Sequence, residues 1–196
     1  MGTRNLTAVY VDGEYRIAQY GQWDGYPEGQ GLTCLGFVRD DMDEKLFRQR
    51  LKETRFMSYE EIRDIYVQGG ADENGFISIA DAKRIEHKYP GLDRDHGAAI
   101  MSLVQSGKVK ELQNSIEFAA DGLFCEWAYV IDLDKRTLEV YRGFSTEPQK
   151  PDERFYFLRD KEEKDNPYGC IHLLKSWSLD NLPSDDEFIA EFSHDE

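Results

Sequence analysis

Residues 6–20 read Leu-Thr-Ala-Val-Tyr-Val-Asp-Gly-Glu-Tyr-Arg-Ile-Ala-Gln-Tyr, and this stretch decides the class of fold. Its Asp12-Gly13 pair separates two runs rich in β-branched and aromatic residues, which favour strands. Tight two-residue hairpin turns need positive φ angles, and Asp-Gly is one of the pairs that adopt them readily. The sequence therefore predicts a β-hairpin with strands over residues 6–11 and 14–20.

A glycine-rich loop follows the second predicted strand. Residues 19–31 read Gln-Tyr-Gly-Gln-Trp-Asp-Gly-Tyr-Pro-Glu-Gly-Gln-Gly, with four glycines and three aromatic rings. Ordering so many glycines costs backbone entropy, whereas the aromatic side chains offer large contact areas with a polar tip. Loops of this composition carry function more often than they serve as spacers. We therefore expect a functional site where this loop meets the chain start.

The middle third of the chain has the start and stop signals of helices. Ser58 and Glu61 form a capping box, and Gly69 ends the helix that the box opens. Asp40 and Asp41 are expected to cap an earlier helix. The predicted helices cover residues 31–38, 41–56, 58–68, 79–89 and 95–106.

Strand-forming residues dominate again after about residue 122. In the first of these runs Trp127 and Tyr129 fall on one face, and Ala128 and Val130 on the other. A second capping box begins at Ser184 and opens a last short helix, with Phe188, Ile189 and Phe192 directed inward. The predicted strands cover residues 123–133, 138–142, 155–158 and 170–177.

This order of elements predicts an α+β fold. Strands at both ends of the chain with helices between them favour one antiparallel sheet built from N- and C-terminal strands. The helical segment is then an insertion at about residues 40–120. No linker or repeat divides the chain, so we expect a single domain over residues 1–196.

Composition excludes several classes of partner. The 24 Lys and Arg residues face 39 Asp and Glu residues, and the formal net charge is −15. Such a charge argues against nucleic acids and anionic membrane surfaces, and it is compatible with a basic protein partner. No apolar run is long enough for a membrane helix, and no signal peptide is evident. Three scattered cysteines indicate buried thiols in a reducing compartment, so we expect a cytoplasmic protein.

Two short motifs carry a resemblance to a known group of proteins. The chain opens with Met-Gly-Thr-Arg, and residues 23–27 read Trp-Asp-Gly-Tyr-Pro after the first hairpin. In these features it resembles an uncharacterised family of small phage, bacterial and fungal proteins. The resemblance is sharpest over residues 1–31 and continues loosely into residues 126–143. It supplies no chemistry, but it implies that the motif positions matter, namely Thr3, Arg4, Trp23, Asp24, Gly25, Tyr26 and Pro27.

Arg4 and Asp24 admit a structural and a functional interpretation. In the structural interpretation they form a buried ion pair that fixes the loop on the hairpin. In the functional interpretation Trp23 and Tyr26 floor a pocket in which Arg4 and Gln22 contact a polar, phosphorylated ligand. The candidate ligand-binding residues are then Thr3, Arg4, Gln22, Trp23, Asp24, Gly25 and Tyr26.

Metal and cofactor motifs are weak or absent. Residues 70–81 imitate a calcium-binding EF-hand loop, but Gly70 at the first position offers no ligand and Asp81 at the last is too short. The four histidines, His87, His96, His172 and His194, show no ligand spacing. No Walker or dinucleotide-binding fingerprint occurs. We therefore predict no metal and no cofactor, and a structural role for His172.

Two functions of different classes remain open. The first is a small-ligand-binding protein, with an enzyme acting on a phosphorylated or nucleotide-like compound as one form of it. Its site would lie between the hairpin and the glycine-rich loop. The second is an acidic interaction protein, an inhibitor or mimic, that binds a basic protein partner. The costly glycine-aromatic loop favours the first.

Overall fold

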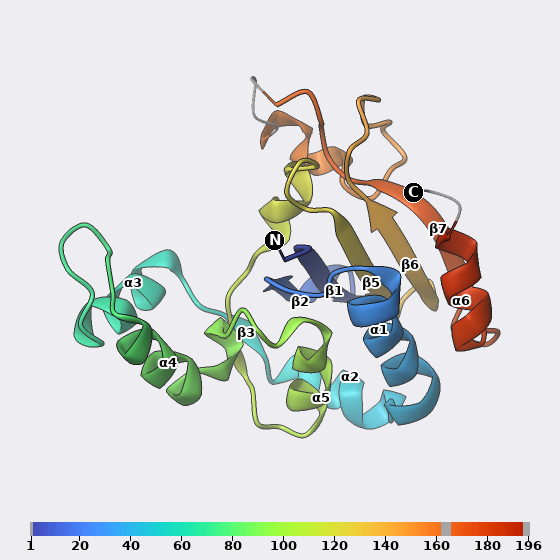
Figure 1. Ribbon diagram of the computed structural model, residues 1–196. Helices are drawn as coiled ribbons and strands as arrows, with labels where there is room; N and C mark the ends of the chain where they lie inside the picture. The colour runs from blue at the N-terminus through green and yellow to red at the C-terminus, as the bar shows by residue number, and fades with distance from the viewer. Residues whose placement is uncertain (1, 162–165, 194–196) are drawn as a thin grey trace.

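The computed structural model describes residues 2–161 and 166–193. Five strands form one sheet in the order β2-β1-β5-β6-β7 (Figure 1). They are β1 (Asn5–Val11), β2 (Glu14–Gly21), β5 (Trp127–Asp132), β6 (Thr137–Arg142) and β7 (His172–Ser178). The predicted α+β fold, with a sheet assembled from N- and C-terminal strands around a helical middle, is confirmed.

One strand pair departs from the antiparallel pattern. Strands β1 and β5 are parallel, with Asn5 opposite Trp127 and Tyr10 opposite Asp132, whereas the other three pairs are antiparallel. Parallel neighbours need a long crossover connection. Strand β2 already returns the chain to the end of the sheet where β1 begins, with Gly21 opposite Asn5. The helical segment then leads from β2, on one side of β1, to the start of β5 on the other side.

The N-terminal hairpin forms as predicted. Val11 pairs with Glu14, and the turn residues Asp12 and Gly13 have φ angles of 54° and 82°. The carboxylate of Asp134, in the turn between β5 and β6, accepts hydrogen bonds from both turn N–H groups at 3.0 Å. These bonds lower the pKa of Asp134, and they fasten the two hairpin turns to each other.

Helices and helical turns fill most of the middle of the chain. Ser58 and Glu61 form the predicted capping box. Asp43, rather than Asp40 or Asp41, caps the preceding helix, because its side chain accepts the N–H of Leu46. The helices are α1 (Leu32–Gly36), α2 (Glu44–Lys52), α3 (Tyr59–Gln68), α4 (Ile79–Lys88), α5 (Ile100–Gln105) and α6 (Asp185–Phe192). The helical turns are η1 (Pro27–Gly31), η2 (Phe37–Asp41), η3 (Pro90–Leu92), η4 (Gly97–Ala99), η5 (Ile116–Ala120) and η6 (Tyr156–Lys161), and β3 (Arg55–Phe56) pairs with β4 (Glu111–Leu112).

Two of the sequence predictions fail in detail. Residues 155–158 are not a strand, because η6 occupies this segment and Phe155 packs edge-on against the ring of Tyr141. Phe155 and Leu158 are therefore buried by packing under the sheet rather than by strand pairing, whereas Phe157 is exposed. The predicted helix over residues 95–106 begins only at η4 and continues as α5, after a bend at Gly97 with a φ angle of 48°.

The sheet is covered on both faces. Trp127, Tyr129 and Ile131 pack into one cluster with residues of α1, α2, α5 and α6. Ala128 and Val130 pack into a second cluster with residues of η5 and η6. The alternating residues of β5 therefore point into two different cores, one on each face of the sheet, rather than alternately into a core and into solvent.

A helical hairpin of α3 and α4 extends away from the sheet (Figure 1). It has a small core of its own, made by Met57, Ile85 and Leu92, and α3 contributes no buried residue. The tip of the hairpin exposes the large side chains of Phe76 and Ile79. This region is therefore held by fewer buried contacts than the sheet.

The three cysteines lie in the interior of the fold. Cys34, Cys125 and Cys170 are all buried, as the sequence predicts. Burial raises the pKa of the Cys34 thiol to about 12, with a smaller opposing contribution from its contact with Thr7. No helix in residues 2–161 and 166–193 has the length and apolar character that crossing a membrane requires.

Candidate functional site

The glycine-rich loop is fixed to the sheet at its start. The N–H of Gly25 donates to the carbonyl of Thr3 at 3.0 Å, and the buried hydroxyl of Tyr129 donates to the carbonyl of Gly25 at 2.8 Å. A Cβ atom at position 25 would lie 2.8 Å from the Thr3 carbonyl, so only glycine permits this approach. Thr3 and Gly25 therefore position the loop from within the structure.

Its second half is equally constrained. The side-chain oxygen of Gln30 accepts the N–H of Ala98 at 2.7 Å, which ties the loop to η4. A Cβ atom at Gly31 would meet the rings of Phe188 and Tyr129 at 2.9 and 3.0 Å. The backbone thus runs directly against two buried rings, and the loop is a rigid platform rather than a flexible tether.

Trp23 is held at this platform with half of its surface exposed. Its indole N–H donates to the Asp95 carboxylate at 3.0 Å, and its ring packs directly on Gly2. Asp95 in turn accepts a hydrogen bond from Lys83 of α4 at 2.8 Å. Lys83 is the main cause that lowers the pKa of Asp95, with a smaller contribution from the Trp23 hydrogen bond. An exposed indole is therefore fixed in one orientation.

Arg94 lies next to Trp23 and has only neutral partners. Its guanidinium lies 5.1 Å from the centre of the Tyr20 ring and hydrogen bonds to the side-chain oxygen of Gln22 and to the Tyr20 hydroxyl. The Gln22 N–H donates to the Arg94 carbonyl at 3.1 Å, which holds the two segments together. Within residues 2–161 and 166–193, Arg94 forms no ion pair with a carboxylate. No carboxylate in that part of the chain pairs with it directly, although its charge is near enough to Asp95 to help lower the pKa of that carboxyl.

These residues line a groove between the loop and the first half of α4. The groove has a volume of about 440 Å³. Trp23, Ile77 and Ile79 give it an apolar surface, and Arg94 contributes positive charge. The charge of Lys83 is balanced by its ion pairs with Asp95 and Glu86. The remaining lining residues are Gln22, Ala82, Glu86 and Asp95. A ligand with a planar apolar part and a charged group matches these surfaces.

Arg4 is not part of this groove, and the proposed ion pair with Asp24 is absent from the described residues. The Arg4 guanidinium lies 4.7 Å from the centre of the Phe124 ring, and its backbone N–H points to the Glu126 carboxylate at 3.4 Å. Parallel pairing of β1 with β5 explains this, because it brings the residues before β1 beside those before β5. Asp24 is exposed at a φ angle of 54°.

The seven candidate residues are thus divided by the structure. Gln22 and Trp23 line the groove, Thr3 and Gly25 support the loop, and Arg4, Asp24 and Tyr26 lie at the surface outside the groove. Sequence reasoning missed Arg94, Asp95 and Lys83. No spacing signal marks them, because they meet the loop only through folding of the helical segment.

The loop that imitates an EF-hand uses its own oxygen atoms internally. The side chain of Asp72 accepts the N–H groups of Asn74 and Phe76 at 2.9 Å. Asp81 accepts the Ser78 hydroxyl at 2.6 Å and pairs with Arg84. In the described part of the chain no group of three or more His, Cys, Asp and Glu residues could hold a metal ion. The prediction of no metal stays a prediction.

His172 has the structural role that the sequence predicts. One ring nitrogen lies 3.1 Å from a Glu153 carboxylate oxygen, and the other lies 3.0 Å from the Glu147 carbonyl oxygen. The ring therefore links β7 to the loop that precedes η6. His194 lies outside the described residues.

A second charged cluster lies at the turn end of the sheet. Arg154 is almost fully buried and hydrogen bonds to the carboxylates of Asp132 and Glu139, and Tyr141 donates to Glu139 at 2.6 Å. Burial alone would lower the pKa of Arg154, but Glu139 and then Asp132 raise it overall. Every charge in this cluster has a partner of opposite sign, so the cluster is a structural support.

Comparison with known proteins adds nothing to this geometry. No family model matches the chain, and neither the curated proteins nor the solved structures contain a match. The resemblance of the Met-Gly-Thr-Arg and Trp-Asp-Gly-Tyr-Pro motifs to a known family therefore stays an expectation. Any function must be argued from the residues of the groove.

Proposed function

We propose that the protein binds a small anionic ligand of the phosphorylated or nucleotide-like class in the groove between Trp23 and α4. One observation carries the proposal: the guanidinium of Arg94 has only neutral hydrogen-bond partners among the described residues and lies beside a fixed, half-exposed indole. Holding a positive charge and an apolar ring side by side in water has no evident structural benefit. It is the arrangement that a charged, planar ligand requires.

The groove matches such a ligand in two places. The indole of Trp23 offers a flat face for a base or another planar ring. The guanidinium of Arg94 offers paired N–H donors to a phosphate or carboxylate, and exchanging the Gln22 amide oxygen for an anion strengthens the hydrogen bonds. Glu86 and Asp95 supply acceptors for hydroxyl or amino groups of the ligand. The groove lining has no Ser, Cys or His nucleophile, so the proposal is binding rather than a reaction.

Calorimetric titration with AMP, ATP and sugar phosphates tests the proposal. We expect saturable binding that Arg94→Gln weakens at least tenfold, because a charge-assisted bidentate contact contributes roughly 1.5–3 kcal/mol. The matched control is Arg63→Gln, which removes the same charge from the exposed face of α3. A response of indole fluorescence that disappears in Trp23→Phe places the ligand on that ring. Absence of binding by every compound, or equal weakening by both arginine variants, contradicts the proposal.

Binding of a basic protein partner is a less well supported alternative. Three carboxylates in the first turn of α6, those of Asp185, Asp186 and Glu187, lie at the surface, and they favour this alternative. However, Asp185 already pairs with Arg39, and Glu187 is engaged by the Ser184 cap. Other carboxylates form ion pairs on α2, α4 and β6, so the negative charge is distributed over several elements.

A further inference from the structure

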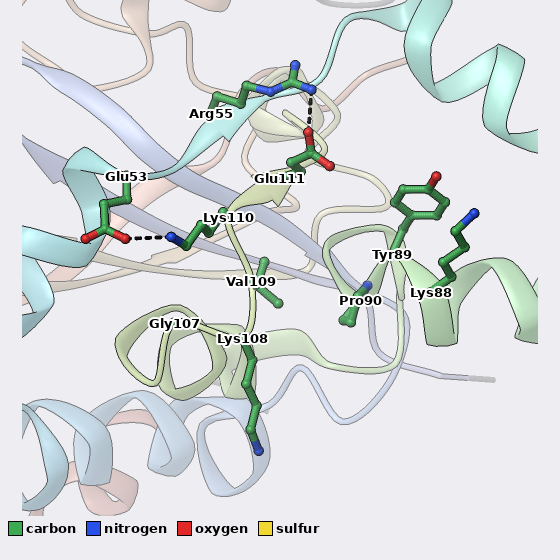
Figure 2. Close-up of a pocket in the computed structure, with 10 residues that line it drawn as sticks. All are labelled: Glu53, Arg55, Lys88, Tyr89, Pro90, Gly107, Lys108, Val109, Lys110 and Glu111. Carbon is green, nitrogen blue, oxygen red and sulfur yellow. Dashed lines mark hydrogen bonds and ion pairs between the residues drawn. The ribbon is translucent and has the colours of Figure 1, made fainter.

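A second groove lies at the other end of α4 from the Trp23 groove (Figure 2). Its volume is about 470 Å³, and three separate segments form it: the connection from α2 to β3, the end of α4, and the residues leading into β4. Its charged lining residues are Arg55, Lys88, Lys108, Lys110, Glu53 and Glu111. We call it the lysine groove.

The lysine groove is a positive region on a strongly negative protein. Four cationic side chains line it against two carboxylates, whereas the whole chain has a net charge of −15. Arg50 lies against Gly107 at the edge of the groove and pairs with Glu53. In a chain with 39 carboxylates, a local excess of positive charge is the feature that needs an explanation.

Both carboxylates of the groove are already engaged. Lys110 lies 2.9 Å from Glu53, and Arg55 lies 2.5 Å from Glu111. Arg55 also pairs with Glu61 of α3 at 2.9 Å, so part of its charge is balanced from outside the groove. Lys110 is the main cause that lowers the pKa of Glu53. Ion pairs at exposed sites are weak and exchange readily, so an incoming carboxylate can replace either glutamate as partner.

Two lysines of the groove have no carboxylate partner among the residues that the structure describes. Lys88 lies over the ring of Tyr89, with its amine 5.3 Å from the ring centre. Lys108 belongs to the segment before β4, and Figure 2 shows its side chain directed away from Lys88, Arg55 and the other labelled side chains. The unpaired charges are therefore spread along the groove rather than gathered at one point.

The surface between these charges is partly apolar. Val109 is buried beneath the groove, and Tyr89 and Pro90 form one wall (Figure 2). A compact anion such as phosphate needs donors that converge on one position, and this groove does not provide them. An extended chain can meet the cations one after another while an apolar side chain rests on Tyr89 and Pro90.

We propose that the lysine groove docks an extended acidic segment of a partner protein, with carboxylates on both sides of an apolar residue. This surface is distinct from the Trp23 groove, and it selects a partner of the opposite charge to the one that the overall composition favours. Its contacts are exposed ion pairs, so the complex forms quickly and weakens with rising salt.

Fluorescence anisotropy with a labelled Glu-Glu-Leu-Glu-Glu peptide tests this inference. We expect binding at low ionic strength and at least tenfold weaker binding of the Gln-Gln-Leu-Gln-Gln peptide. The double variant Lys88→Gln/Lys108→Gln should also lose about tenfold in affinity. The matched control is Lys45→Gln/Lys135→Gln, which removes two exposed lysines outside the groove, and it should change affinity less than twofold. Circular dichroism establishes that both variants are folded.

Each of the following results overturns the inference: no binding of the acidic peptide, equal weakening by the control variant, displacement of the peptide by micromolar pyrophosphate, and peptide-induced amide shifts away from residues 53–55, 88–90 and 107–111. Self-association of the protein that Lys88→Gln/Lys108→Gln abolishes identifies a second copy as the occupant and likewise excludes a separate partner. Nucleotide binding at Trp23 is measured independently, so either proposal can fail alone.

Discussion

Two arginines lie over tyrosine rings at opposite ends of the N-terminal hairpin. Arg154 lies 5.3 Å from the ring centre of Tyr10 near the turn, and Arg94 lies 5.1 Å from that of Tyr20 where β2 ends. Arg154 is buried between two carboxylates, whereas Arg94 is exposed and has neutral partners. The same contact is therefore part of a closed support at one end and part of an open site at the other. Under the proposed function, the partners of the guanidinium, not its ring contact, distinguish a structural arginine from a ligand-binding one.

Removing Arg154 should have the largest effect on stability. Arg154→Met keeps most of the side-chain volume but leaves Asp132 and Glu139 buried without a cation. We expect a loss of about 3–5 kcal/mol in the free energy of unfolding, measured with urea. The control Arg63→Met, at an exposed pair on α3, should cost less than about 0.5 kcal/mol. Similar costs for the two variants would contradict a structural role for the cluster.

A smaller loss is expected when one hydrogen bond of that cluster is removed. Tyr141→Phe deletes the hydroxyl that donates to Glu139 at 2.6 Å and leaves the ring contact with Phe155 in place. The cost should be about 1–3 kcal/mol, because a hydrogen bond to a buried charge is lost. Burial and the neighbouring Glu139 raise the pKa of Tyr141, so its hydroxyl should also fail to ionise in alkaline absorbance titrations of the folded protein.

The stability of the fold should also depend on pH through Asp134, which lies at the turn end of the sheet. Its pKa is lowered in the folded state by the N–H groups of Gly13 and Asp12, so the ionised carboxylate stabilises the fold. That contribution is present above the unfolded-state pKa of about 3.9 and is lost as pH falls through the lower folded value. Asp134→Asn should therefore be less stable than the wild type at pH 7, and the two should converge in acid. A constant difference between pH 7 and pH 2 would contradict this.

At the open end, Arg94→Gln should have the smallest effect on stability. The side chain is exposed and its partners are neutral, so the unfolding free energy should change by less than about 0.5 kcal/mol. Ligand binding should weaken at least tenfold in the same variant. A variant that unfolds far more easily would place Arg94 with Arg154 among the supports and remove the contrast between the two ends.

Local signals in the sequence predicted local structure well. Asp12-Gly13 formed the expected turn, and the capping boxes at Ser58 and Ser184 began helices where predicted. These features depend on residues a few positions apart, whose backbone and side-chain chemistry is sufficient to specify them. The α+β class could also be predicted, because it depends on the order of strands and helices along the chain rather than on their contacts.

Long-range placement was not predictable from one sequence. The parallel pairing of β1 with β5 joins residues 122 positions apart, from Asn5 and Trp127 onward, and it moved Arg4 beside Phe124. Arg94 reaches Gln22 only through the path of the helical segment. Trp23 could be named a candidate because an aromatic residue in a glycine-rich loop is conspicuous, whereas a single exposed arginine after a helical turn, such as Arg94, is not.

The parallel pairing of β1 and β5 has a consequence for synthesis. The hairpin can form as soon as it leaves the ribosome, but the free edge of β1 has no partner until β5 has been made. At about 5–20 residues per second, the edge of β1 waits for about 6–24 s while the helical segment is translated. Exposed strand edges pair with other chains, so nascent chains of this protein pass through an aggregation-prone interval that the finished sheet no longer shows.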